Sequence, residues 1–160
     1  MMPKTDVLLS IRPEWCELIR SGEKKTELRR SKPTLPTPFK CYIYCTKPKR
    51  ESDSFWIVNK PREGAIEERF YGNGSIIGEF ICDDIGQFEL LENGNIRDWH
   101  SSGADLSCVA YEDAAEYIKN AAFGYAWHIS NLIMYKKPKA LNDFKLFAAP
   151  QSWRYVTSAE

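Results

Sequence analysis

The sequence predicts an α+β domain built around a small mixed β-barrel with two or three flanking helices. Several segments of strand length are rich in aromatic and β-branched residues, and two short segments have the apolar spacing of a helix. We expect the strands to close into a barrel, because closure removes exposed edges. The chain has 160 residues, enough for one domain and too few for two ordinary ones, so residues 1–160 are interpreted as a single domain.

The N-terminal part predicts a strand followed by a helix. Residues 6–11 are apolar and of strand length. Pro13 suits the first helical position, where its missing N–H needs no partner, and Gly22 suits a left-handed cap at the helix end. By their i, i+3, i+4 spacing, the residues expected on the buried stripe of this helix are Trp15, Leu18 and Ile19.

Two further strands are predicted after this helix. Residues 25–30 have an extended pattern in which alternation places Glu27 and Arg29 on the same face. Residues 31–38 contain three prolines and are expected to form a rigid connection. Residues 39–46 are aromatic and β-branched, which favours a strand.

The middle of the chain has the weakest pattern. Residues 47–74 are polar and rich in turn residues, with a short helix predicted at 65–70. Residues 75–83 indicate a strand, which residues 88–91 extend. Glu79 falls on the apolar face of that strand, so either this face is solvated or Glu79 has a cationic partner, because an unpaired buried carboxylate is costly.

The C-terminal part predicts one helix and the longest strand. Residues 111–120 have helical character, and residues 125–135 form the longest strand candidate. Residues 138–147 are expected to be partly extended, and residues 151–156 to close the fold.

The charge is balanced overall but unevenly distributed. Residues 1–50 hold twelve Lys and Arg against five Asp and Glu, residues 51–118 hold four against fifteen, and residues 119–160 hold six against two. A protein that coats nucleic acid through charge alone would be basic overall, so we expect anion binding only at a local basic face. No apolar run is long enough to cross a bilayer or to resemble a signal peptide, and we expect a cytoplasmic protein without membrane contact.

The cysteines and histidines do not form a metal-binding pattern. The cysteine number is odd, no Cys-x-x-Cys pair occurs, and neither His100 nor His128 lies at a zinc-finger spacing from a cysteine. We therefore expect neither a metal nor another cofactor, and we interpret the cysteines as small buried residues: Cys16, Cys41, Cys45, Cys82 and Cys108.

The sharpest candidate site is the turn and strand SGEKKTELRR at 21–30. Lys24 and Arg29 could grip phosphate or carbonyl oxygens, and Glu27 between them could accept a hydrogen bond from a base amino group or act as a proton acceptor. The alternative is an exposed ion-paired strand, worth about 0–1 kcal/mol and without a function. From spacing alone, this alternative is favoured.

Two weaker candidates lie near the end of the chain. In YAWHIS, Trp127 and His128 point to opposite sides of a strand, and an exposed aromatic ring there could stack on a base, although such rings more often belong to a core. His128 is interpreted as structural. In PQSWRY, Gln151 and Ser152 offer hydrogen bonds, with capping or packing as equally simple roles.

A longer pattern resembles a known family. The run SIRPEWCELIRSGEKKTELRR at 10–30 resembles the opening of ASCH domains, relatives of the PUA-like fold, through the spacing G-x-K-x-x-E-x-R of Gly22, Lys24, Glu27 and Arg29. Later segments resemble its bacterial and phage-type members in the same order: YIYCT at 42–46, SIIGEF at 75–80, YAWHISNL at 125–132, KPKAL at 137–141 and PQSW at 150–153.

The resemblance implies a PUA-like β-barrel with an RNA-binding cleft beside the first helix. Some ASCH relatives are hydrolases, either amidohydrolases acting on acetylated cytidine or ribonucleases. The amidohydrolase pattern has a nucleophilic threonine where this sequence has Glu27, and a carboxylate cannot form the corresponding acyl ester, although it could activate water.

Three functional hypotheses follow, and the sequence does not decide whether the protein is an enzyme. The first is a module that binds RNA or a nucleoside-like ligand. The second is a small hydrolase of a modified nucleoside or of RNA, in which Lys24 stabilises an oxyanion and Glu27 activates water. The third is a protein-interaction adaptor. The ligand-binding residues predicted for the first hypothesis are Lys24, Glu27, Arg29, Arg30, Tyr44, Trp127 and Ser152.

Overall fold

A computed structural model describes residues 4–92, 96–98, 109–119, 121 and 123–157, and it confirms the predicted α+β class. Among these residues, no helix is long and apolar enough to span a membrane. The elements in chain order are β1 (Thr5–Ile11), α1 (Pro13–Ser21), β2 (Thr26–Arg29), β3 (Phe39–Cys45), the 3-10 helix η1 (Glu51–Asp53), β4 (Trp56–Asn59), β5 (Glu68–Tyr71), β6 (Ser75–Leu90), β7 (Ile96–Asp98), α2 (Tyr111–Ile118), β8 (Gly124–Lys139), the 3-10 helix η2 (Leu141–Phe144) and β9 (Trp153–Thr157).

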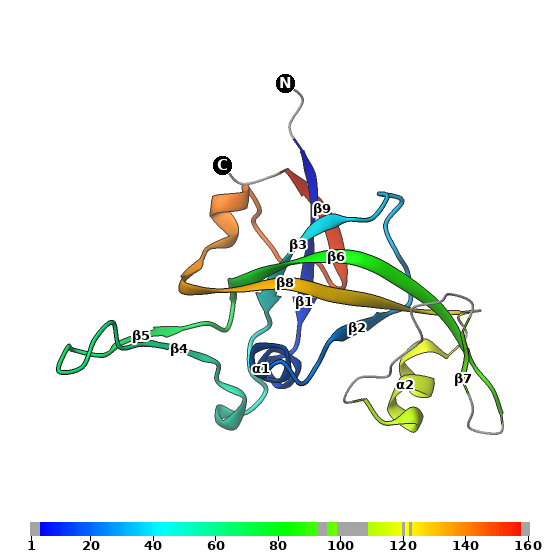
Figure 1. The fold of residues 1–160 in the computed structure, drawn as a ribbon, viewed down its shortest axis with the longest axis horizontal. Helices are drawn as coiled ribbons and strands as arrows, with labels where there is room; N and C mark the ends of the chain where they lie inside the picture. The colour runs from blue at the N-terminus through cyan, green and yellow to red at the C-terminus, as the bar shows by residue number, and fades with distance from the viewer. Residues whose placement is uncertain (1–3, 93–95, 99–108, 120, 122, 158–160) are drawn as a thin grey trace.

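The strands form one large mixed sheet and a separate hairpin. The hydrogen-bonded order of the large sheet is β2-β8-β6-β3-β1-β9, with β7 paired to β6, and β4 and β5 make the hairpin. Strands β1 and β3 are parallel, whereas the other pairs are antiparallel. The long strands β6 and β8 cross the body of the molecule, α1 and α2 lie on one side of them, and the hairpin projects away (Figure 1).

The predicted closed barrel is wrong for the described part of the chain. Strands β2 and β9 stand at the two ends of the pairing order and are not paired with each other. The chain that follows β2 carries Pro33, Pro36 and Pro38, which have no N–H to continue a ladder. The gap between the two ends of the sheet, which we call the seam, is therefore bridged in another way.

Side chains bridge the seam. The guanidinium of Arg29 donates from Nη2 to the carbonyl oxygen of Ser10 on β1 at 2.7 Å, and from Nη1 to the carbonyl and hydroxyl oxygens of Ser152 at 3.2 and 3.1 Å. The indole N–H of Trp153 on β9 donates to the hydroxyl of Ser31, which follows β2, at 3.0 Å. These bonds take the place of a backbone ladder.

The sheet has apolar residues on both faces. Val7, Leu9 and Ile11 of β1 point into the main core, which also contains the fully buried Trp127. The intervening Leu8 points the other way, into a smaller cluster with Tyr42 and Tyr44 of β3, Ile76, Phe144 and Val156. Both faces of β1 and β3 are buried because the chain after β8 returns across the second face.

The two predicted helices are present. Pro13 opens α1, and Gly22 caps it in the left-handed region with φ of 84°. The buried stripe is shifted from the prediction: Cys16 and Ile19 are buried, whereas Trp15 and Leu18 are only half-buried. Trp15 packs against the main core on one side and lines a pocket on the other, which leaves it partly exposed. Helix α2 falls within its predicted range.

The helix predicted at 65–70 is wrong. Strand β5 occupies the second half of this range and pairs with β4, where Trp56 and Tyr71 stand opposite each other with ring centroids 5.3 Å apart. Cross-strand packing of this kind favours an extended conformation over a weak local helical pattern. The segment predicted as an extended tail, 138–147, is extended only to Lys139 and then forms η2. Cys108 and His100 lie outside the described residues.

Glu79 has a cationic partner, which resolves the question posed by its place on β6. Lys40 Nζ lies 3.2 Å from Oε2, and the Tyr135 hydroxyl donates to Oε1 at 2.8 Å. Partial burial by itself raises the pKa of Glu79, but the hydrogen bonds from Tyr135 and Lys40 and the charges of Lys40 and Lys139 outweigh it, so the pKa is lowered below its ordinary value of 4.5. The same burial and the Glu79 carboxylate raise the pKa of Tyr135.

This lowered pKa predicts an acid-dependent loss of stability. Because the folded-state pKa of Glu79 lies below 4.5, its carboxylate stabilises the fold above that pH, and this contribution is lost as the pH falls through the folded-state pKa. We expect Glu79→Gln to lower the free energy of unfolding at neutral pH, and the difference from the wild type to shrink in acid. Urea unfolding at several values between about pH 3 and pH 7 measures this, and a difference independent of pH would contradict it.

The seam predicts a large effect of removing Arg29. Arg29→Met deletes three hydrogen bonds across the seam and leaves Glu27 buried beside Lys24 alone, so we expect the free energy of unfolding to fall by about 3–5 kcal/mol. Arg29→Lys keeps the charge but not the planar fork, and we expect it to recover only part of the loss.

The matched control for Arg29 is Arg154→Met. Arg154 is exposed on β9, and its guanidinium donates to the carbonyl oxygen of the adjacent Tyr155. We expect a change within about 0.5 kcal/mol, as at most surface positions. Chemical denaturation measures both variants, and equal stability of Arg29→Met and Arg154→Met would show that the seam does not depend on the guanidinium.

Candidate functional site

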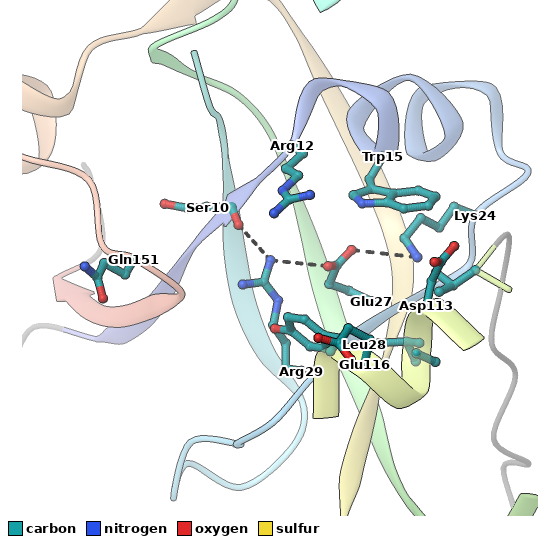
Figure 2. Close-up of a pocket in the computed structure, with 13 residues that line it drawn as sticks. Ser10, Arg12, Trp15, Lys24, Glu27, Leu28, Arg29, Asp113, Glu116 and Gln151 are labelled. Carbon is teal, nitrogen blue, oxygen red and sulfur yellow. Dashed lines mark hydrogen bonds and ion pairs between the residues drawn. The ribbon is translucent and has the colours of Figure 1, made fainter. Parts of the chain in front are cut away.

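A pocket of about 560 Å³ lies between the N-terminal end of α1, strand β2 and helix α2. Strand β2 supplies Glu27, Leu28 and Arg29. Figure 2 shows the Arg12 guanidinium, the Trp15 ring and the Lys24 ammonium arranged around the Glu27 carboxylate. The remaining wall comes from α2 and its approach, and from Gln151 before β9: Val109, Asp113, Ala114, Glu116 and Tyr117 belong to this wall.

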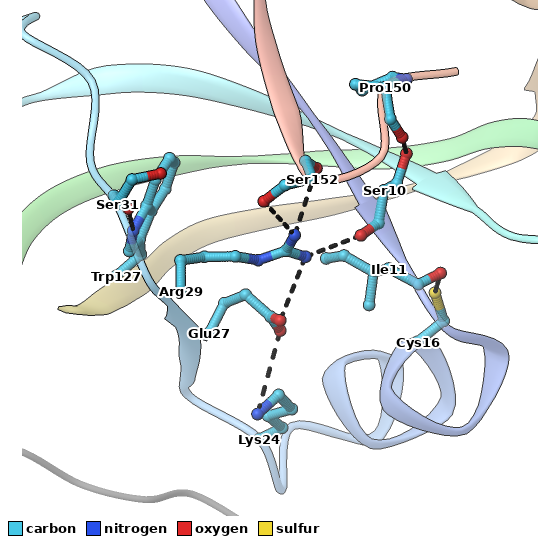
Figure 3. A network of polar contacts seen from close by, with 10 residues as sticks. All are labelled: Ser10, Ile11, Cys16, Lys24, Glu27, Arg29, Ser31, Trp127, Pro150 and Ser152. Atoms are coloured by element: carbon cyan, nitrogen blue, oxygen red, sulfur yellow. Dashed lines mark hydrogen bonds and ion pairs between the residues drawn. The ribbon is translucent and has the colours of Figure 1, made fainter. Parts of the chain in front are cut away.

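Lys24, Glu27 and Arg29 converge as predicted, and the alternative of an exposed ion-paired strand is wrong. Lys24 Nζ lies 3.9 Å from Glu27 Oε2, and Arg29 Nη2 lies 3.3 Å from Glu27 Oε1. Their side chains are 1%, 9% and 6% exposed, respectively. Figure 3 shows this line of charges running from Lys24 through Glu27 to Arg29 and on to Ser10 and Ser152.

Local structure positions these three side chains. The left-handed Gly22 ends α1, and the backbone N–H of Lys24 then donates to the carbonyl oxygen of Leu18 at 3.0 Å, which folds the turn back against the helix. The two-residue period of β2 directs Glu27 and Arg29 to the same face. Lys24 Nζ also lies 5.2 Å from the centre of the Trp15 ring, within reach of a cation–π contact.

One oxygen of Glu27 is incompletely satisfied. Arg29 Nη2 faces Oε1, but Oε2 is buried and has no hydrogen-bond partner among the described residues. The Lys24 ammonium at 3.9 Å supplies charge to Oε2 without a hydrogen bond. Because Glu27 lines the pocket, Oε2 is an acceptor available to a ligand there.

The structure places Tyr44 and Trp127 elsewhere. Trp127 is fully buried in the main core and has no exposed ring face, so the prediction that it stacks on a base is wrong. Tyr44 is 7% exposed and belongs to the second cluster, where burial, followed by the nearby Cys45, raises its pKa. Neither residue lines the pocket.

Arg30 and Ser152 lie beside the pocket instead of in its lining. The Arg30 guanidinium carbon is 5.6 Å from the centre of the Tyr117 ring, and Tyr117 does line the pocket. Ser152 accepts hydrogen bonds from Arg29 and so holds it in place. His128 forms an exposed pair with Asp83, 2.6 Å from Nδ1 to Oδ1, in agreement with its structural interpretation.

The sequence did not single out several pocket residues. Arg12 and Trp15 were assigned to a predicted helix and its buried stripe, and nothing local distinguishes them as ligand-facing. Asp113, Glu116 and Tyr117 lie more than eighty positions after β2, and only the tertiary structure brings α2 against that strand. The alternation of acidic and apolar residues in α2 indicates a solvated face but not its neighbour.

The four described cysteines, Cys16, Cys41, Cys45 and Cys82, are free and buried. Burial raises the pKa of Cys82 to about 12 and also raises those of Cys16 and Cys41, so these thiols are protonated and unsuited to nucleophilic attack. No group of three or more His, Cys, Asp or Glu side chains suited to a metal ion occurs within the part of the chain that the structure describes.

Comparison with solved structures identifies the fold. The chain is similar to the ASCH protein of Zymomonas mobilis, with a TM-score of 0.63 at 19% identity, covering 94% of this chain and 86% of the other. Two variants of that protein give TM-scores of 0.64 and 0.66 at 19% and 18% identity, covering 96% and 99% of this chain and 91% and 93% of theirs. No protein-family model and no curated protein matches the chain. The predicted likeness to ASCH proteins is confirmed at the level of the fold.

Proposed function

We propose, from the ASCH fold of the chain and the chemistry of its pocket, that the protein binds RNA or a nucleoside-like ligand in the pocket beside α1. The observation that carries the proposal is the buried Oε2 of Glu27, which faces the pocket without a hydrogen-bond partner among the described residues. A volume of about 560 Å³ lies within the usual range of small-molecule pockets.

The state of Glu27 favours a ligand that donates a hydrogen bond. Leaving a buried acceptor unsatisfied costs about 1–3 kcal/mol, and more when the acceptor is charged. Lys24 and Arg29 provide positive charge on both sides of the carboxylate and orient Glu27 for an incoming N–H group. A nucleobase presents such N–H groups on its edge, and carboxylates are common acceptors for base amino groups.

Aromatic rings on two walls of the pocket also favour a base. Trp15 of α1 is half-buried and lines one wall, and Tyr117 of α2 is 41% exposed and lines another. Stacking of a base on an aromatic side chain is worth about 1–3 kcal/mol. These two residues replace Tyr44 and Trp127 in the stacking role.

The charge of the walls favours a short ligand over a long strand. Two acidic residues of α2, Asp113 and Glu116, also line the pocket. The chain as a whole has no net charge. A polynucleotide needs a continuous basic track for its phosphates, whereas one nucleotide unit needs only the pocket.

The binding proposal predicts that Glu27→Gln reduces ligand-induced stabilisation. Gln retains one acceptor but loses the charge that strengthens the bond, so we expect affinity to fall by about tenfold or more, equivalent to about 1.4 kcal/mol. A thermal-shift screen of nucleosides, nucleotides and short RNAs finds the ligand, and titration calorimetry measures its affinity for both proteins.

The control for Glu27 is Glu23→Gln, an exposed carboxylate in the same turn that does not line the pocket. We expect it to bind as the wild type does. If none of these ligands shifts the unfolding temperature at low ionic strength, binding of nucleic acid is excluded and the adaptor hypothesis gains support. If Glu27→Gln binds with unchanged affinity, the carboxylate does not contact the ligand.

A hydrolase is the second candidate, because the pocket holds a carboxylate and an ammonium 3.9 Å apart. In that function Glu27 would accept a proton from water, and Lys24 would stabilise the oxyanion formed at the substrate carbonyl or phosphoryl group. The lack of a threonine at position 27 argues against the covalent route of the ASCH amidohydrolases.

Activity assays distinguish this candidate from simple binding. If the protein hydrolyses N4-acetylcytidine or a short RNA, we expect Glu27→Gln to reduce kcat by about 100-fold or more, as for loss of a general base, while Glu23→Gln retains full activity. Product formation measured by chromatography gives both rates. Binding without turnover of any of these substrates would leave the pocket as a binding site alone.

A further inference from the structure

We infer that the ligand of the pocket carries one anionic group, as in a nucleoside monophosphate, and that Arg12 is the residue that binds this group. The inference rests on the proposed function and adds the ligand's charge and its orientation. It also adds a residue that the sequence did not single out.

Arg12 differs from the other two cations of the pocket. Lys24 and Arg29 both face Glu27, and Arg29 donates further hydrogen bonds to Ser10 and Ser152. Arg12 lines the pocket and is exposed, and its side chain has no hydrogen-bond or ion-pair partner within residues 4–92, 96–98, 109–119, 121 and 123–157. Figure 2 shows its guanidinium directed into the hollow toward Glu27.

The backbone at Arg12 also favours an anion. Arg12 is the N-cap residue of α1, followed by Pro13 at the first helical position. The amino end of a helix carries partial positive charge, and a guanidinium beside it adds a full charge and a planar fork suited to phosphate. A helix end alone would not identify a site, but Oε2 of Glu27 gives an independent indication of a ligand, because it is buried in a residue that lines the same pocket and accepts no hydrogen bond from the described residues.

The acidic wall limits where negative charge can lie. Asp113 and Glu116 are exposed and line the side of the pocket formed by α2. Glu116 is paired with Lys119 at 2.9 Å, so it is the Asp113 carboxylate that repels a phosphate placed there, whereas Arg12 on the opposite wall attracts one. The pocket therefore has one end for an anion and one for hydrogen-bond donors.

This arrangement favours a ligand that carries hydrogen-bond donors at one end and a single anionic group at the other. An N–H edge would meet Glu27, while a single phosphate would meet Arg12 at the amino end of α1. An internal nucleotide of a strand has a phosphate on both sides of its sugar, so one of the two would approach the acidic wall. A nucleoside monophosphate, or the terminal nucleotide of a strand, avoids that repulsion.

Calorimetric titration tests the inference with defined probes. The four ribonucleosides and their 5′- and 3′-monophosphates are titrated into the wild type, Arg12→Gln, Arg12→Lys and the control Arg62→Gln. Arg62 is exposed in the turn between β4 and β5 and does not line the pocket. Because Arg12 is exposed, unfolding temperatures close to that of the wild type verify that its variants are folded.

We expect the wild type to bind one monophosphate about tenfold or more tightly than the matching nucleoside, with a preference that weakens as salt is added. Arg12→Gln removes this preference by weakening binding of the monophosphate far more than that of the nucleoside. Arg12→Lys keeps part of the preference, and Arg62→Gln keeps all of it.

Two results would overturn the inference while leaving the proposed function intact. One is equal affinity of the wild type for the nucleoside and its monophosphates. The other is a preference for the monophosphate that survives in Arg12→Gln. If neither nucleosides nor monophosphates bind the wild type, both the inference and the proposed function fail, so the two failures are distinguishable.

Discussion

The buried ion pair between Arg29 and Glu27 is the interaction on which both the fold and the pocket depend. Arg29 reaches from the first strand of the pairing order to Ser10 and Ser152 at its other end, where no backbone ladder joins the strands. Its charge is stabilised there because the Glu27 carboxylate lies 3.3 Å away and because Ser10 and Ser152 accept hydrogen bonds from its two terminal nitrogens. The same two residues line the pocket, so Arg29 both bridges the seam and holds Glu27 in position at the site.

The ion pair of Arg29 and Glu27 leaves one carboxylate oxygen without a hydrogen bond, and this oxygen determines the chemistry of the pocket. Arg29 is occupied by the seam, whereas Oε2 of Glu27 has only the charge of Lys24 nearby and no hydrogen-bond partner among the described residues. Around this acceptor, α1 supplies an aromatic ring, its N-cap residue Arg12 supplies a guanidinium that has no partner in the described part of the chain, and α2 supplies a second ring and two carboxylates. A pocket with one buried acceptor, two rings and opposite charges on its walls is suited to a small, orientated ligand more than to a long anionic strand.

Much of the fold followed from local pattern. Pro13 and Gly22 mark the ends of α1, and the aromatic and β-branched runs of β3, β6 and β8 mark the strands, because capping and strand propensity act within a few residues. Predictions from the local pattern were wrong where pairing with another strand determines the conformation of a segment. Residues 65–70 suggested a helix, but 68–70 belong to strand β5, which pairs with β4. The sheet remained open because the proline-rich chain after β2 cannot continue a ladder.

For the site, the sequence by itself determined that Lys24, Glu27 and Arg29 lie close together, because a left-handed cap followed by a two-residue period fixes their relative directions. Tertiary structure alone decided that these charges are buried, that α2 lines the same pocket, and that Trp127 belongs to the core while Trp15 lines the pocket. It also decided that the Arg12 side chain has no partner among the residues that the structure describes. The physical reason is that burial and pairing depend on which distant elements pack together, and no short-range preference of the chain encodes that packing.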